Sequence, residues 1–257
     1  MKMGLHHPAN ILKPYIKTFL IIESECGMEN RTLPDTSIVL AFRYRGAITD
    51  NSIGVKNNLP ASLITGVRRS VRLINYSGHA AALLVIFKPG GASAFFKEPL
   101  HELFGSSLPL NDLMSAGKLK EVEEQLAEAN NNLQRIAVIE RFLRSLLRVS
   151  SPDLLIQQAI GQIQLNKGNL KIKQLVNSLP ISHDPFEKRF RQLTGTSAKQ
   201  FSSIVRMRHV IDNYTAPKSL TEAALSAGYF DQAHFIKDFK LFTGLTPLDF
   251  FRAPHYW

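Results

Sequence analysis

The sequence predicts an α+β protein of two domains, a β-rich barrel or sandwich-like N-terminal domain with trailing helices and an all-helical C-terminal domain. Three observations support this prediction. Short β-branched and aromatic runs fill the first third of the chain, and a proline-free amphipathic stretch then covers residues 117–149. A helix-turn-helix pattern occurs twice after residue 151. With 257 residues there is room for two ordinary domains, which we expect at residues 1–150 and 151–257.

Charge and composition narrow the classes of function. The chain has 31 Lys and Arg against 21 Asp and Glu, a net charge of +10, which favours a polyanionic partner such as nucleic acid. Its single cysteine, Cys26, excludes an intrachain disulfide and fits a reducing compartment. There is no signal-peptide pattern, and no apolar run approaches the roughly 18–20 residues that a membrane helix needs. We therefore expect a cytoplasmic protein that makes no membrane contact.

Five strand-like segments are expected in the N-terminal half. The first two are short, β-branched or aromatic, and bounded by Pro, Asp, Gly and Asn. Strands at this spacing, with turn residues between them, predict an antiparallel sandwich or barrel. A helix should begin near Ser93. The five segments cover residues 15–22, 37–44, 63–68, 71–76 and 81–87.

No pattern in this half is typical of an enzyme or a metal site. The sequence has no G-x-S-x-G, P-loop or dinucleotide-binding motif. His79 and His101 have no histidine or carboxylate near them at metal-ligand spacing, and Cys26 follows two glutamates, which disfavour a reactive thiolate. We expect no catalytic residue, no cofactor and no metal.

Two basic clusters in this half leave two interpretations open. Arg68, Arg69 and Arg72 form one cluster, and Arg43 and Arg45 form the other. Either cluster could be a solvated strand end, which is the simpler interpretation, or an anion site for an acidic effector. Which residues bind an effector stays unknown at this stage.

The stretch 117–149 predicts a helical connector. Asn130–Asn132 should divide it into two helices, because three consecutive asparagines disfavour helix. A hydrophobic stripe could dock on the β-rich domain or pair two protomers in a homodimer, and both alternatives stay open. The stripe consists of Leu119, Val122, Leu126, Leu133, Ile136, Leu143 and Leu146 or Leu147.

The final stretch predicts a short helix, a tight turn and a second helix. Ser219 is a candidate N-cap and would form a capping box with Glu222. Gly228 suits the helix end and Asp231 the start of the next helix. Phe235, Phe239 and Phe242 then give that second helix a buried aromatic face, opposite a polar one.

An earlier segment repeats this plan, after two further helices expected at residues 153–163 and 170–179. Ser182 is the candidate N-cap, Phe186 and Phe190 form the buried face, and Gly195 ends the helix. Phe186 and Phe235 are 49 residues apart, so the motif is duplicated within the chain. A single helix from Ala198 to Tyr214 should separate the two copies and span roughly 25 Å at about 1.5 Å per residue.

The C-terminal stretch resembles the signature region of the AraC/XylS family of bacterial transcription regulators. Segments of the first half resemble the distinct β-rich N-terminal domain found in one subgroup of that family, namely Leu33–Asp35, Ile64–Gly66, Phe87–Ala92 and Pro99–Leu103. The matched C-terminal positions are Ala224, Gly228, Tyr229, Asp231 to Phe235, Phe239, Lys240, Gly244, Thr246 and Pro247.

The resemblance implies which residues meet DNA. Gln can bridge adenine N6 and N7, Lys can donate to guanine, Glu can accept from cytosine N4, and an Ala methyl can touch thymine. The expected base-reading residues are Asp184, Glu187 and Lys188 on the first recognition helix and Gln232, Ala233, His234 and Lys237 on the second. The expected phosphate contacts are Arg191, Lys199, Arg206, Lys218 and Lys240.

The implied function is sequence-specific transcription regulation, through two adjacent major grooves of double-stranded DNA about 34 Å apart. The N-terminal domain would sense a small-molecule effector or a partner, and RNA polymerase would be a partner if the protein is an activator. Two alternatives are kept. One is a DNA-binding protein without an effector, whose N-terminal half serves only for homodimerisation. The other is an enzyme with a DNA-binding tail.

Overall fold

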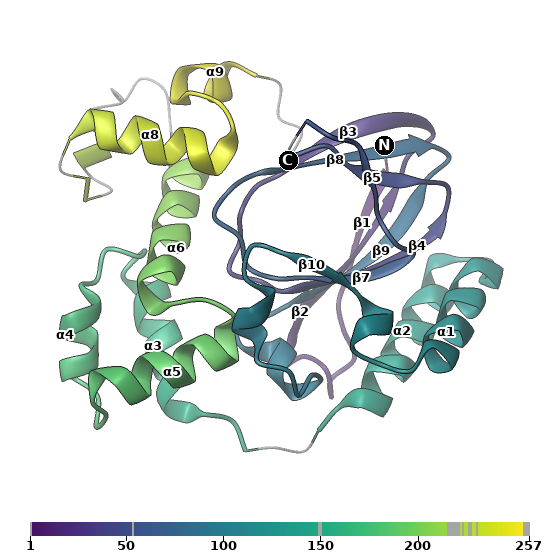
Figure 1. Ribbon diagram of the computed structural model, residues 1–257, viewed down its shortest axis with the longest axis horizontal. Coiled ribbons are helices and arrows are strands. Elements are labelled where there is room, and N and C mark those ends of the chain that lie inside the picture. Colours follow the sequence, from purple (N-terminus) through teal and green to yellow (C-terminus); the bar gives the residue numbers. More distant parts are fainter. Residues whose placement is uncertain are drawn as a thin grey trace.

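Two antiparallel β-sheets pack beside a group of helices in the computed structural model (Figure 1). The structure describes residues 2–52, 54–148, 151–214, 222, 224–225, 228–229 and 231–253. The strands lie in the first half of the chain and the helix-turn-helix region in the second, so the two-domain α+β prediction is confirmed. In the part of the chain described, no helix has the length and apolarity needed to cross a bilayer.

The N-terminal domain is built from a six-stranded and a four-stranded sheet. All five expected strand segments coincide with strands. In the described ranges the pairings of the two sheets do not close into one ring, so the arrangement is a sandwich of open sheets. The six-stranded sheet has the order β1 (Lys2–His6), β2 (Ile16–Glu23), β9 (Ala81–Phe87), β4 (Val39–Arg45), β7 (Ser62–Thr65), β10 (Ser107–Pro109), and the four-stranded sheet β3 (Cys26–Thr32), β8 (Arg72–Gly78), β5 (Ile48–Asp50), β6 (Asn57–Asn58).

Strands β1, β3, β5, β6 and β10 are not expected from the sequence. Strand β3 has the sequence CGMENRT, which lacks alternating apolar residues, and only Asn30 in it is buried. It is a strand because it pairs along its length with β8, from Cys26 opposite Gly78 to Thr32 opposite Arg72. Tertiary pairing therefore overrides weak local preference here.

The connector forms two helices, as expected. Helix α1 covers Ala116–Glu128 and α2 covers Asn132–Leu146, and the Asn131 side chain caps α2 by accepting a hydrogen bond from the backbone of Gln134. Helix α1 packs on β4 of its own chain, which is the docking alternative. One residue of the predicted stripe is wrong: Leu133 is 73% exposed, because it lies in the first turn of α2, outside the packed face. Before the connector lie the 3-10 turns η1 (Gly91–Ala94), η2 (Leu100–Leu103) and η3 (Leu110–Asp112), and the first of these takes the place of the helix expected near Ser93.

The C-terminal region contains the expected helices and one more. The helix expected from Ser219 falls mostly outside the described residues, although Glu222, Ala224 and Leu225 are helical. The other helices are α3 (Leu154–Leu165), α4 (Ile172–Asn177), α5 (His183–Thr194), α6 (Ala198–Asn213), α8 (Gln232–Thr243) and α9 (Pro247–Arg252), of which α9 is the addition.

The buried apolar residues of the helical region belong to two different cores. Helices α3 to α5 and the start of α6 enclose a core of their own around Phe186, Phe190 and Phe201. The core around Phe235 and Phe239, in contrast, is continuous with that of the β-rich domain. Helix α8 is therefore packed into the same core as the sheets, whereas α3 to α5 have a separate core.

Candidate nucleic-acid interface

The two helices expected to read DNA, α5 and α8, end in the same way. At the end of α5, the Thr194 hydroxyl donates to the carbonyl oxygen of Phe190 at 2.8 Å, and Gly195 follows with φ of 81°. At the end of α8, the Thr243 hydroxyl donates to the carbonyl oxygen of Phe239 at 2.8 Å, and Gly244 follows with φ of 78°. Only glycine adopts this left-handed conformation without strain. The duplication seen in the sequence thus extends to matching hydrogen bonds 49 residues apart.

Helix α5 buries its aromatic face and exposes its polar one. Phe186 and Phe190 are fully buried, whereas Asp184 and Lys188 are exposed. Glu187 is partly buried and accepts a hydrogen bond from Arg191 Nε at 3.0 Å. The three expected base-reading residues thus lie on one accessible side of the helix, with Arg191 engaged along the helix.

Helix α8 has the same division. Phe235 and Phe239 are fully buried, while the four expected base-reading residues are exposed. Asp231 caps the helix by accepting from the backbone N–H of His234 at 2.7 Å. His234 also approaches the Asp238 carboxylate at 3.5 Å and stands edge-on to the Tyr229 ring. The four exposed residues are Gln232, Ala233, His234 and Lys237.

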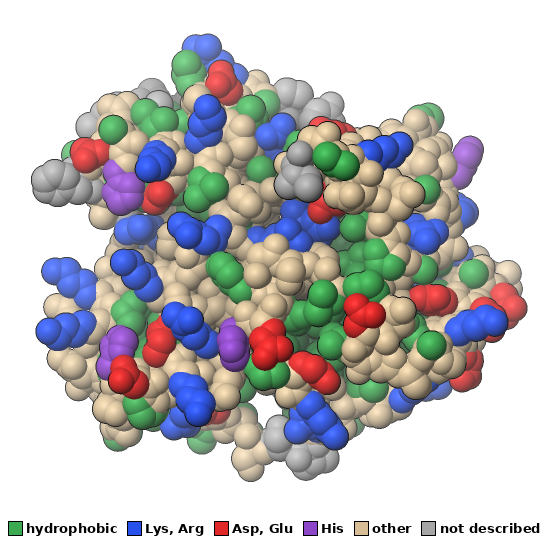
Figure 2. Space-filling model, viewed as in Figure 1, with side chains coloured by type: hydrophobic (Ala, Val, Ile, Leu, Met, Phe, Trp, Pro, Cys, Tyr) green, Lys and Arg blue, Asp and Glu red, His purple; other side chains and the backbone are tan. Residues whose placement is uncertain are grey.

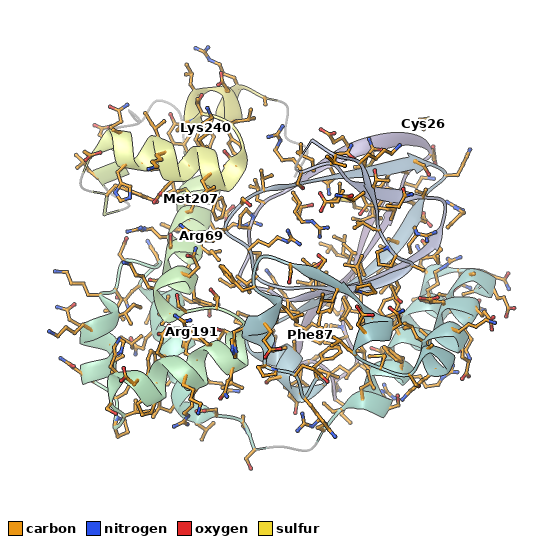
Figure 3. All side chains as sticks on the ribbon, viewed as in Figure 1. Cys26, Arg69, Phe87, Arg191, Met207 and Lys240 are labelled. Carbon is orange, nitrogen blue, oxygen red and sulfur yellow. The ribbon has the colours of Figure 1, made fainter. Side chains whose placement is uncertain are left out.

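The expected phosphate contacts fall into different environments. Lys199 and Lys240 are exposed, as is Arg191, and Figure 3 labels Lys240 on α8 and Arg191 on α5. Arg206 is only half-exposed, and its guanidinium carbon lies 4.5 Å from the centre of the Tyr229 ring. That contact joins α6 to the turn before α8. Lys218 lies outside the described residues.

Sequence reasoning missed two basic residues at the start of α4. Lys171 is the N-cap residue of this helix and Lys173 lies in its first turn, and both are exposed. The first helix of a helix-turn-helix crosses the DNA backbone, which is the signal that could have identified them. In the view of Figure 2, Lys and Arg side chains gather over the helical part of the molecule.

Comparison with known proteins identifies this region. Residues 175–253 match a family model described as a helix-turn-helix domain. The chain carries an AraC-type helix-turn-helix domain. It is thus a DNA-binding regulator of the AraC type. Residues 5–109 match a second family model, a domain of unknown function (DUF6597), and a search of curated proteins finds no match.

Three solved structures show how far the likeness of this regulator extends. ToxT from Vibrio cholerae is 10% identical with a TM-score of 0.47, covering 97% of each chain. The xylose-binding transcription activator XylR is 20% identical with a TM-score of 0.35, covering 46% of this chain and 37% of that one. The AraC-like transcriptional activator CuxR is 15% identical with a TM-score of 0.30, covering 77% of each. At TM-scores below 0.5 these likenesses do not bear on the geometry of any site.

The two domains of the regulator meet along a polar seam. Arg208 on α6 donates from Nε to the carbonyl oxygen of Pro34 at 2.7 Å, and its guanidinium lies 3.8 Å from the Asp35 carboxylate. Arg31 on β3 donates from Nη1 to the carbonyl oxygen of Thr243 at 3.1 Å, at the end of α8. Each of these two arginines joins the β-rich domain to a helix of the DNA-binding region.

A second contact between the domains involves the first recognition helix. Helix α5 packs against η1 and η2 of the N-terminal domain. His101 on η2 borders a crevice whose other wall consists of polar residues of α5, including Asp184, Glu187 and Lys188. Part of the expected base-reading face of α5 therefore lines this crevice beside the β-rich domain.

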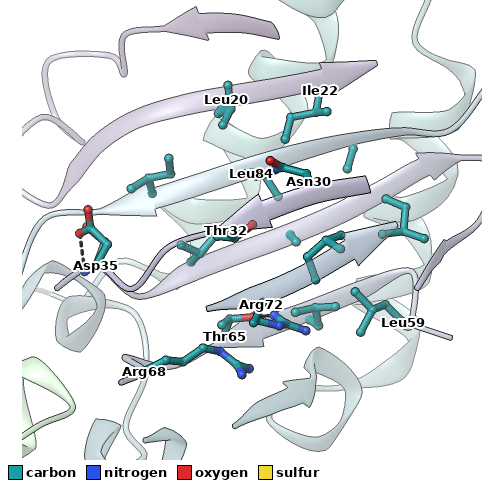
Figure 4. Close-up of a pocket in the computed structure, with 18 of the residues that line it drawn as sticks. Leu20, Ile22, Asn30, Thr32, Asp35, Leu59, Thr65, Arg68, Arg72 and Leu84 are labelled. Carbon is teal, nitrogen blue, oxygen red and sulfur yellow. Dashed lines mark hydrogen bonds between the residues drawn. The ribbon is translucent and has the colours of Figure 1, made fainter. Parts of the chain in front are cut away.

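A cavity of about 330 Å³ lies between the two sheets of the N-terminal domain (Figure 4). Aliphatic residues from both sheets line it, among them Leu20, Ile22 and Ile74. The seam arginines Arg31 and Arg208 line it as well. No group of three or more His, Cys, Asp or Glu side chains suited to a metal ion occurs in the described ranges.

Proposed function

We propose that this protein is a sequence-specific transcription regulator, without enzymatic activity, in which residues 151–257 read DNA and residues 1–150 sense a ligand or partner. The single observation that carries the proposal is the pair of matching recognition helices, α5 and α8. Each buries its aromatic face and exposes a polar face of base-reading residue types.

Both helices would act on one stretch of double-stranded DNA. Helix α6 connects the two units with 16 residues, a length of about 24 Å. Successive major grooves on one face of DNA are about 34 Å apart, so a rod of this length between two recognition helices suits adjacent grooves. The expected base contacts are Asp184, Glu187, Lys188, Gln232, Ala233, His234 and Lys237. The expected phosphate contacts are Arg191, Lys199, Arg206, Lys218 and Lys240, to which we add Lys171 and Lys173.

Control by a small-molecule effector follows from where the cavity lies. Arg31 and Arg208 line the cavity and also hold the seam between the domains. A ligand that contacts either guanidinium would change its interaction with the DNA-binding helices. Such a ligand would have different affinities for two domain arrangements, which is the condition for coupling between two sites.

A regulator of this kind has further partners in the proposal. Two copies of the chain would bind two DNA sites as a homodimer, and RNA polymerase would be contacted if the protein activates transcription. The competing proposal is a DNA-binding protein whose N-terminal half only dimerises. A shift of melting temperature by a cavity ligand would favour effector control, because a ligand of the native state alone must stabilise it.

Selection from a random DNA library at about 150 mM salt tests the proposed function. We expect the wild type to enrich a site with two short blocks about one helical turn apart. The double variant Gln232→Ala with Lys237→Ala should lose one of the two blocks, because only α8 is changed. Lys120→Ala, which removes an exposed lysine on α1, is the matched control and should behave as the wild type.

Two results would contradict the proposal. Binding that shows no sequence motif and fades uniformly with salt would mean that charge alone attracts DNA. Enrichment of a single block that the double variant leaves unchanged would remove the role assigned to α8.

A further inference from the structure

Two arginine side chains enter the cavity from the same edge. Arg68 follows β7 and Arg72 begins β8, and both line the cavity. Figure 4 shows them beside each other together with Thr65, across from the aliphatic side chains of Leu20 and Ile22. Among the described residues, only one carboxylate, that of Asp50, forms an ion pair with either of these two arginines.

The Asp50 carboxylate forms an ion pair with Arg72. Arg72 is 7% exposed, and its Nε and Nη2 atoms lie 2.8 Å and 2.6 Å from Oδ2 of Asp50. Burial is the largest single effect on Asp50 and raises its pKa, but the hydrogen bonds from Ser52 and the charge and hydrogen bond of Arg72 together outweigh it, so the pKa of Asp50 is lowered. The aspartate is therefore ionised at neutral pH and balances one guanidinium.

Arg68 forms no such ion pair within the described ranges, and the Asp50 charge acts on it only from a greater distance. Its Nη2 donates to the neutral hydroxyl of Ser107 at 2.8 Å, and its Nε is buried without a hydrogen-bond partner. Burial, followed by the nearby charge of Arg72, lowers the pKa of Arg68 to about 10, and the charge of Asp50 opposes this shift only in part. The side chain remains cationic at neutral pH, so one partly buried positive charge at this edge is left with only partial compensation, a costly arrangement.

The opposite walls of the cavity are apolar. Leu20, Ile22 and Leu84 come from the six-stranded sheet, and Ile74 from the four-stranded one. A volume of about 330 Å³ lies within the range of small-molecule sites, roughly 300–1,000 Å³. The shape and charge together suit a molecule with an anionic end and an aliphatic body.

We propose that the effector of this regulator is a small organic anion, an aliphatic carboxylate or phosphate monoester, whose charged oxygens bridge Arg68 and Arg72. Planar guanidinium groups bind such oxygens in a bidentate manner, and a charged ligand supplies the missing counter-charge. The inference rests on the proposed function, because it names the ligand class for the N-terminal cavity. The alternative of a solvated strand end, open at the level of sequence, applies instead to Arg69, which is exposed.

Titration calorimetry of the full chain without DNA tests this inference with four probes of equal chain length. These are octanoate, octyl phosphate, 1-octanol and octylamine. We expect at least one of the two anions to bind at least tenfold more tightly than 1-octanol, and octylamine not to bind. Comparing the affinities for octanoate and octyl phosphate distinguishes the carboxylate class from the phosphate class. Equal affinity for octanoate, octyl phosphate and octanol, or binding by none of the four, would overturn the inference.

Variants assign the effect to the guanidinium. Arg68→Gln should lower the affinity for the anion at least tenfold and leave the affinity for 1-octanol unchanged. Arg69→Gln, at the exposed neighbouring position, should have the affinities of the wild type. Arg68→Lys guards against a folding defect, since it keeps the charge and should bind with intermediate affinity. Unchanged anion binding in Arg68→Gln would also overturn the inference.

A variant of the competing carboxylate should strengthen binding of the anion. Asp50→Asn removes the carboxylate that competes with the ligand for Arg72, so we expect its affinity for the preferred anion to rise, provided its melting profile stays cooperative. An unchanged or lower affinity in a folded Asp50→Asn protein would count against the bridging geometry. Since these titrations contain no DNA and the library selection contains no ligand, each can fail independently of the other.

Discussion

At the scale of single residues, two lysines of α8 should separate specificity from affinity. Lys237 and Gln232 are both exposed and both expected to read bases, whereas Lys240 lies in the last turn, where its carbonyl oxygen accepts the N–H of Gly244. A base contact affects one position of the DNA site, and a phosphate contact affects all sequences alike. Replacing each lysine should therefore have a different effect on DNA binding.

Lys240→Ala should weaken binding to every sequence by a similar factor and reduce the salt slope of log K by about 0.9. Lys237→Ala should reduce discrimination at one base pair by about 1–3 kcal/mol. Dissociation constants for the selected site and its single-base variants, at several salt concentrations, measure both quantities. A change in sequence preference in Lys240→Ala would mean that this residue also contacts a base.

At the scale of elements, the end of α3 is fitted closely to α6. Gly168 has φ of 74°, and a Cβ added there would lie 2.2 Å from the carbonyl oxygen of Ser202. The Ser202 hydroxyl in turn donates to the carbonyl oxygen of Gly168 at 2.9 Å. Gly161, inside α3, has no heavy atom within 4 Å of such a Cβ. Helix α3 and the turn that follows it thus offer one unconstrained and one constrained glycine.

Gly168→Ala should lower the free energy of unfolding by about 2–4 kcal/mol, because it combines backbone strain with a steric clash. Gly161→Ala should raise the same quantity by about 0.5–1 kcal/mol, since alanine is the better helix former. Urea denaturation of both variants measures the difference. An unchanged free energy of unfolding in Gly168→Ala would show that α3 and α6 can move apart without destabilising the protein.

At the scale of the whole molecule, the continuous core predicts shared cooperativity. The buried cluster of the sheets extends without interruption to Phe235, Phe239 and Phe250 of the DNA-binding region. Arg31 and Arg208 add hydrogen bonds across the same seam. The β-rich domain and the second helix-turn-helix unit should therefore unfold together.

Scanning calorimetry tests this cooperativity. The wild type should show one main transition, and Arg31→Gln with Arg208→Gln should separate it into two, because the polar links across the seam are lost. Arg141→Gln, an exposed position on α2, is the matched control and should leave the profile unchanged. Separate wild-type transitions for the β-rich domain and the α8 unit, distinct from any transition of the separately packed α3 to α5, would show that the seam couples the domains only weakly.

The sequence by itself determined the elements whose signals are local. Hydrophobic periodicity indicated the five inner strands and the connector helices, and caps such as Asp231 and glycines such as Gly195 marked the recognition helices. The polar faces of those helices follow from the spacing of their phenylalanines alone, since a 3.6-residue period fixes what lies opposite. Most of the candidate DNA-contacting residues were predictable for this reason.

The tertiary structure decided what depends on distant partners. Strand β3 forms through pairing with β8, Arg206 faces Tyr229 across the helical region, and the exposed position of Leu133 depends on which side of α2 meets the sheet. The difference between Arg68 and Arg69 is of the same kind. One enters the cavity while its neighbour is exposed, and only the packing of two sheets distinguishes adjacent residues of identical chemistry.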